Sequence, residues 1–117
     1  MQKVLTPAVA VDFDGTICEN AWPGIGEPNW ELINWLCWWR ENGNKLILWT
    51  NRTGDKLEEA VTACKAWGLR FDAVNENLPE RIQFFGNDCR KVSADYYIDD
   101  KSTVVYKVSP RPIVLYP

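Results

Sequence analysis

The chain has 117 residues, of which 46% are hydrophobic and 25% are charged, and its formal net charge is -3. This length allows one domain with a single core, and the composition is typical of a folded globular protein rather than a disordered or fibrous one. The acidic charge balance argues against non-specific binding to nucleic acid or to an anionic membrane. We therefore expect one globular domain over residues 1–117, with nucleic acid possible as a substrate only.

The cysteines and the N-terminus bear on metal chemistry and on location. The four cysteines include no C-x-x-C pair and the chain has no histidine, which argues against the usual zinc and cysteine–histidine sites. The first residues, MQKVLTPAVAVDFD, lack the apolar stretch of a signal peptide, and no apolar run approaches the ~20 residues of a membrane span. The sequence thus predicts a cytoplasmic protein with reduced thiols and no membrane contact.

In chain order, two strands with a helix between them come first. Residues 8–12 and 45–50 are short apolar runs bounded by turn-forming residues, which predicts two buried strands. The intervening helix is expected to begin after Asn29, as its N-cap, and to stop near Gly43.

The rest of the chain repeats this alternation. GDKLEEAVTACKAW predicts a helix with a capping box that starts at Asp55 and a stop at Gly68. A short helix is expected from Pro79 through ERIQFF. Strands are predicted around residues 71–74, in ADYYIDD (94–100), and in TVVYKV and PIVLYP. Strands that alternate with helices predict an α/β fold, in which a parallel, Rossmann-like sheet carries helices on both faces in three layers.

The chain is rich in tryptophan, with seven in all, and four of them fall on the first predicted helix. Trp35 and Trp39 share a face of that helix with two leucines, so we expect them in the core, whereas Trp38 points elsewhere. A subunit interface is the alternative explanation for this cluster. Trp22, in the preceding loop, either anchors its own loop or stacks on a base or sugar of a substrate.

Acidic and hydroxyl side chains follow three of the predicted strands. Asp12 and Asp14 come after the first strand, Thr50 ends the second, and Asp99 and Asp100 follow the fourth. Ligands of a parallel sheet bind at the carboxyl ends of its strands, so these groups should meet at one edge. Four carboxylates at such range cannot all stay ionised without a counter-charge. Oxygen ligands without histidine or paired cysteine select a hard cation, which favours Mg²⁺.

Two other classes of acidic site fit the sequence less well. An EF-hand that began at Asp12 would need an acidic ligand where this chain has Pro23. A receiver domain carries its phosphoacceptor aspartate after the third strand, where this chain has Asn75 and Glu76.

Together these motifs resemble the haloacid dehalogenase superfamily of phosphotransferases. The likeness rests on DFDGT after the first strand, ILWTNR at the end of the second, Lys91, and YYIDD on a later strand, and it covers residues 8–100. It is nearest to the small members of the superfamily with a minimal or absent cap, because only the short segment 18–28 separates the first motif from the following helix.

The resemblance implies a role for each motif residue. Asp12 would be the nucleophile that forms a transient aspartyl-phosphate, and Asp14 would be the general acid and then the general base. Thr50 would bind the phosphoryl oxygens, and Lys91 would offset negative charge, with Arg90 or Lys101 as alternatives for that role. Asn51 and Arg52 are further substrate-binding candidates, although Arg52 could equally be a solvated loop charge. The metal ligands would be Asp12, Asp14 through its backbone carbonyl, and Asp99 or Asp100.

The function implied is a Mg²⁺-dependent phosphatase that hydrolyses phosphomonoesters, because aspartate at the position of Asp14 is typical of the phosphatases and mutases of this superfamily. A polynucleotide 3′-end phosphatase is a narrower form of this hypothesis, and a catalytically idle phosphate-binding or interaction domain is the alternative. A site without a cap either accepts large substrates or borrows a lid from a neighbouring subunit, which favours a homo-oligomer.

Overall fold

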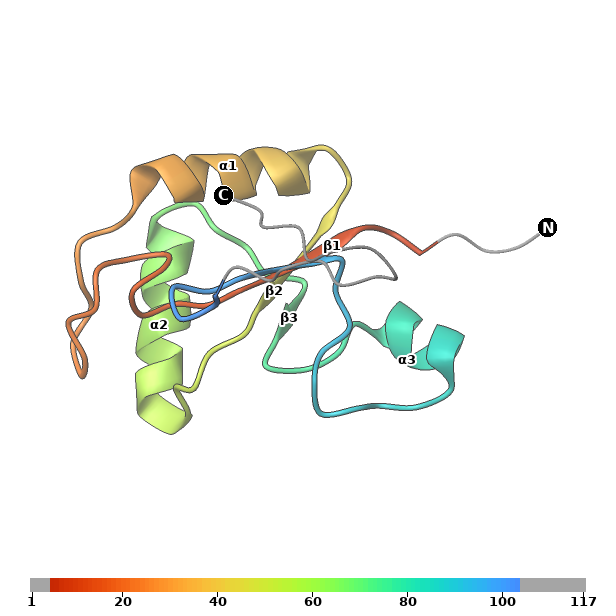
Figure 1. Ribbon diagram of the computed structural model, residues 1–117. Coiled ribbons are helices and arrows are strands. Elements are labelled where there is room, and N and C mark those ends of the chain that lie inside the picture. Colours follow the sequence, from red (N-terminus) through yellow and green to blue (C-terminus); the bar gives the residue numbers. More distant parts are fainter. Residues whose placement is uncertain (1–4, 104–117) are drawn as a thin grey trace, which may run out of the picture.

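The structure is a computed structural model, and it describes residues 5–103 (Figure 1). Four strands alternate with three helices, in the order β1 (Ala8–Val11), α1 (Trp30–Glu41), β2 (Lys45–Leu48), α2 (Gly54–Ala66), β3 (Ala73–Val74), α3 (Pro79–Phe85) and β4 (Tyr96–Ile98). Each of these elements was expected from the sequence. The strands predicted in TVVYKV and PIVLYP extend into or lie in residues outside the described range. Within residues 5–103, no helix combines the length and the apolar character that a membrane span requires.

The four strands form one parallel sheet in the order β3-β2-β1-β4, which confirms the predicted α/β fold with a parallel sheet and is compatible with a Rossmann-like fold. β1 is a central strand, and its last residue, Val11, is level with Leu48 of β2 and Ile98 of β4. The backbone N–H of Asp12 donates to the Ile98 carbonyl over 2.9 Å, so the register continues one residue past the strand. The residues that follow β1, β2 and β4 therefore leave the sheet side by side.

Alternate residues of the strands feed two separate cores. Val9 and Val11 belong to a cluster that includes Ile33 and Leu36 of α1 together with residues of α2. Ala8 and Ala10 point to the other face, where Leu78, at the start of α3, and Val92 complete a second cluster. Because both faces are covered, all four residues of β1 are buried. In Figure 1, α3 accordingly lies apart from α1 and α2.

The start of α1 is capped as predicted. The Asn29 Oδ1 accepts a hydrogen bond from the Leu32 N–H over 3.2 Å, and its Nδ2 donates to the Thr16 carbonyl over 3.2 Å. The second bond ties the helix to the loop after β1. The prediction of a capping box at Asp55 was wrong. Helix α2 begins one residue earlier, at Gly54, and its N-cap residue, Thr53, makes no side-chain capping hydrogen bond.

The predicted core position of Trp35 was also wrong. The residues that α1 buries are Ile33 and Leu36, and Trp35 is 40% exposed. Trp35 instead stacks on Trp39, with ring centres 5.5 Å apart, at the flank of the helix that meets β4 through Tyr96. Trp38 lies away from the core and is exposed, as expected. This aromatic surface is compatible with a subunit contact, and the homo-oligomer stays a prediction.

Candidate active site

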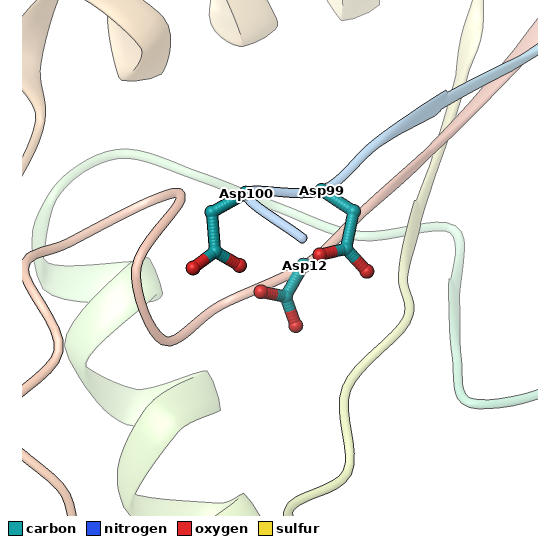
Figure 2. Close-up of side chains that lie close together, drawn as sticks. All are labelled: Asp12, Asp99 and Asp100. Carbon is teal, nitrogen blue, oxygen red and sulfur yellow. The ribbon is translucent and has the colours of Figure 1, made fainter. Parts of the chain in front are cut away.

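Three carboxylates meet where β1 and β4 end. Asp12 follows β1, and Asp99 and Asp100 follow β4. One oxygen of each lies within 4.8 Å of the others, and Figure 2 shows the three groups converging. The pKa of Asp12 is raised from 3.8 to about 6. The main cause is the partial burial of the carboxyl group, and the second is the negative charge of Asp99. A cation bound among the three carboxylates would offset both the cost of burial and the repulsion between them.

Thr16, which the sequence analysis did not assign, ties this trio together. Its Oγ1 lies 3.2 Å from Asp12 Oδ2 and 3.4 Å from Asp100 Oδ1, and it accepts a hydrogen bond from the Asp100 N–H over 3.0 Å. The single hydroxyl proton can serve one carboxylate at a time. Gly15 has a φ of +83°, and a Cβ there would collide with the Asp100 carboxylate, so only glycine allows this close approach. Gly15 and Thr16, the last two residues of DFDGT, thus help to position the carboxylates around Asp12.

Asp14 has a different partner from the other three aspartates. Its two oxygens accept hydrogen bonds from Arg52, one from Nε over 2.8 Å and one from Nη2 over 2.7 Å. The Asp14 carboxylate is not part of the converging trio, so the structure does not place that carboxylate among the metal ligands. This pairing leaves its backbone carbonyl as the group predicted to contact a metal.

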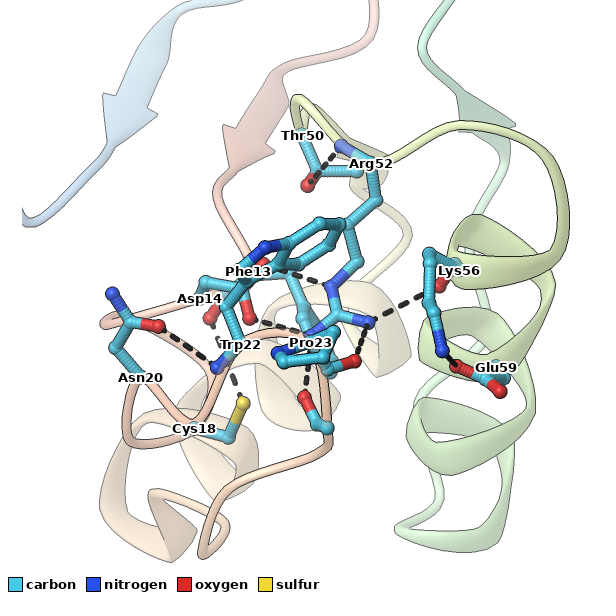
Figure 3. A network of polar contacts seen from close by, with 11 residues as sticks. Phe13, Asp14, Cys18, Asn20, Trp22, Pro23, Thr50, Arg52, Lys56 and Glu59 are labelled. Atoms are coloured by element: carbon cyan, nitrogen blue, oxygen red, sulfur yellow. Dashed lines mark hydrogen bonds and ion pairs between the residues drawn. The ribbon is translucent and has the colours of Figure 1, made fainter.

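Arg52 uses its hydrogen-bond donors within the protein, which argues against its predicted role as a substrate-binding residue. It is 1% exposed, and besides Asp14 it donates to the carbonyls of Pro23, Gly24 and Lys56. The rings of Phe13 and Trp22 pack against the guanidinium, with their centres 5.0 and 4.9 Å from Cζ. Figure 3 shows this network between the loop after β1 and the start of α2. The same bonds show that Arg52 is no solvated loop charge.

Thr50 and Asn51 lie beside the trio, as predicted. A cavity of about 280 Å³ is lined by both residues, and also by Arg52, Lys101 and all four aspartates. The Thr50 Oγ1 accepts a hydrogen bond from the Arg52 N–H over 3.2 Å, which leaves its own proton to donate into the cavity. Asn75, another unassigned residue, holds this turn: its Oδ1 accepts from the Thr50 N–H over 2.8 Å and its Nδ2 donates to the Arg52 carbonyl over 3.3 Å.

Lys91 does not line this cavity. Its Nζ lies 4.7 Å from the centre of the Tyr97 ring and borders a different cavity, whereas Lys101 lines the one that holds the aspartates. Tyr97 is paired with Ala10, so it occupies the sheet face from which Asp12 and Asp99, each two residues further on, also project. Lys91 thus sits on the appropriate face, and its catalytic role stays a prediction.

The Arg52–Asp14 pair should carry a large share of the local stability. Arg52→Ala is expected to lower the free energy of unfolding by about 3 kcal/mol, because it leaves a half-buried carboxylate and several carbonyls without their donor. Urea denaturation measures this. Lys56→Ala is the matched control, because it breaks an exposed 3.3 Å ion pair with Glu59 and should cost below about 0.5 kcal/mol. Equal, small losses in the two variants would contradict this assignment.

The raised pKa of Asp12 predicts how stability depends on pH in the metal-free protein. Between 3.8 and about 6 the folded state holds more protons on Asp12 than the unfolded state does, so stability falls as pH rises through this window. Asp12→Asn removes the penalty and should raise the melting temperature in chelator at pH 7.5, with little gain at pH 4. Glu58→Gln, at an exposed position on α2, should change it little at either pH. Equal gains at both pH values for Asp12→Asn would contradict the shift.

Comparison with known proteins adds a structural relative. No protein-family model and no curated protein matches the sequence. Among solved structures, a conserved protein from Bacteroides thetaiotaomicron is 42% identical, with a TM-score of 0.72, and the match covers 84% of this chain and 78% of that one. At this identity and coverage, the chain belongs to the same family as the conserved Bacteroides thetaiotaomicron protein.

Proposed function

We propose that the protein is a Mg²⁺-dependent phosphomonoester phosphatase of the haloacid dehalogenase type, without a folded cap, that acts through an aspartyl-phosphate on Asp12. The observation that carries this proposal is the convergence of Asp12, Asp99 and Asp100 at the end of a central parallel strand, beside the hydroxyl of Thr50 and an open cavity. Phosphoryl transfer needs a positioned nucleophile, hydrogen-bond donors for the equatorial oxygens and a cation, and this set of groups suits all three.

The donor set fits Mg²⁺. The three converging groups are carboxylates, which are the ligands of a hard cation. Partial burial, and after it the negative charge of Asp99, raises the pKa of Asp12, and a bound cation would offset both effects. Asp12, Asp99 and Asp100 would hold the ion, with the Asp14 carbonyl as a further candidate. When bound, Mg²⁺ would neutralise these carboxylates and stabilise the negative charge of the phosphoryl group.

The chain's own residues would divide the chemistry between them. A carboxylate oxygen of Asp12 attacks phosphorus and the bond from phosphorus to the ester oxygen breaks. Asp14 enters this step with a proton on a lone pair that Arg52 leaves free, and it gives that proton to the ester oxygen. Asp14 then takes a proton from the water that releases phosphate from Asp12. Each Asp14 oxygen accepts one bond from Arg52 and keeps a lone pair for these transfers. Arg52 is thus a positioning residue, and Thr50 donates its free proton to a phosphoryl oxygen.

Metal dependence and the nucleophile can be tested together with p-nitrophenyl phosphate. The wild type should hydrolyse it with Mg²⁺, lose activity in chelator, and work poorly with Ca²⁺, which takes more ligands at longer distances. Asp12→Asn should lower kcat by more than about a hundredfold because it removes the attacking oxygen, whereas Glu58→Gln should retain the wild-type rate. Full activity in chelator would contradict the metal assignment. A wild type that binds phosphate yet hydrolyses no ester in a panel would favour the catalytically idle domain.

The lysine can be assigned by comparing two alanine variants. We propose that Lys91 moves from Tyr97 into the cavity when substrate binds, because an exposed cation–π contact is worth only about 0.5–1 kcal/mol and a phosphoryl dianion offers more. Lys91→Ala should lower kcat about tenfold or more, and Lys101→Ala should lower it less. The reverse ranking, measured on the same ester at saturating Mg²⁺, would assign the role to Lys101 instead.

A further inference from the structure

We propose that Trp22 is a stacking wall of the cavity, and that the preferred phosphomonoesters carry a flat aromatic ring in the group esterified to phosphate, as nucleoside monophosphates do. This inference rests on the proposed function and deepens it, because it concerns the part of the substrate that does not react. It is carried by the position of Trp22, its exposure and the way its loop is held.

The position of Trp22 places an indole ring in the same cavity as the proposed nucleophile. Trp22 and Asp12 both line the cavity of about 280 Å³, and Asn20 is also part of its lining. One contact of the ring is fixed, because the Arg52 Cζ lies 4.9 Å from its centre. Figure 3 shows the indole beside Arg52 within the network. The cavity that holds the proposed nucleophile is therefore also lined by a tryptophan ring.

The exposure of Trp22 argues against the simpler role of anchoring its own loop. A loop anchor buries its ring, yet Trp22 is 57% exposed. The loop is held instead through its backbone: Arg52 donates to the carbonyls of Pro23 and Gly24, and the Glu19 N–H donates to the Glu27 carbonyl over 2.9 Å. Because these bonds already fix the loop, the indole is left available for another contact.

Arg52 also holds the indole of Trp22 in place before a ligand binds. The guanidinium is buried and has five oxygen acceptors besides its contact with the ring, so it cannot move without breaking the Asp14 pair. A ring held in place before binding loses little conformational entropy when a ligand stacks on it. Stacking of a base on an aromatic side chain is sequence-tolerant, and its loss typically weakens binding by about tenfold or more. The wall therefore selects for a flat ring rather than for one particular base.

The test compares two phosphate esters of ribose, one with an aromatic base on the sugar and one without. Adenosine 5′-monophosphate and ribose 5-phosphate share the same primary ester oxygen, so their intrinsic reactivity is matched. With Mg²⁺, the wild type should show a kcat/KM at least about tenfold higher for the nucleotide, mainly through KM. Trp22→Ala should lower kcat/KM for the nucleotide toward the value for ribose 5-phosphate and so remove this preference, and Trp22→Phe should keep most of it. Phe84→Ala, which removes a similarly exposed ring on α3, should leave the turnover of both esters unchanged.

Binding measurements separate this inference from the proposed function. Calorimetry with Asp12→Asn protein and the same two esters measures stacking without turnover. We expect the nucleotide to bind about tenfold more tightly than ribose 5-phosphate, and this difference should disappear in Asp12→Asn/Trp22→Ala. Such a result would support the stacking role of Trp22 even if no ester is hydrolysed. If the wild type hydrolyses both esters equally well, or Trp22→Ala weakens both to the same extent, Trp22 has only a structural role and the inference is overturned.

Discussion

The buried guanidinium of Arg52 is the interaction on which the arrangement of the site depends. It comes from the turn after β2, yet its bonds reach Asp14 after β1, the carbonyls of Pro23 and Gly24 in the following loop, and the Lys56 carbonyl at the start of α2. A buried arginine is tolerated only when its donors are satisfied and its charge is paired, and here one carboxylate and three carbonyls do this. The positions of the turn, the loop and the helix are therefore coupled through a single side chain.

The two aspartates of DFDGT meet opposite electrostatic environments as a result. Asp14 faces a cation that the chain itself supplies, at 2.7 Å. Asp12, two residues earlier, faces Asp99 and Asp100, and its pKa is raised by partial burial and by the negative charge of Asp99. One carboxylate is thus held in place by the protein, while the other is left for a ligand to compensate. This separation agrees with the proposed roles, in which Asp14 handles protons and Asp12 attacks phosphorus.

Much of this arrangement could be predicted from the sequence because it depends on strand ends. Once β1, β2 and β4 are recognised as parallel strands, their carboxyl ends must share an edge, and Asp12, Thr50 and Asp99 were placed together correctly. Contacts that depend on how a loop folds back could not be predicted in this way. Arg52 was taken for a substrate contact or a solvated charge because no local pattern shows that it pairs with a residue 38 positions away. Trp35 was misplaced because two leucines suggested the buried face of α1, whereas Ile33 and Leu36 form it.

The loop that carries Trp22 also bears on how the site could exclude water if, as we propose, no folded cap covers it. A cap closes over the substrate as a separate body, but here the segment 18–28 is fastened to the site by Arg52 and by its own backbone bonds, including the pair between Glu19 and Glu27. A loop that is fixed by these bonds cannot make the large movement that closure over a substrate requires. In exchange, it presents Trp22 in a fixed position before the substrate arrives. Exclusion of water would then come from the organic part of the substrate itself, stacked on that ring, so that recognition and desolvation become the same event.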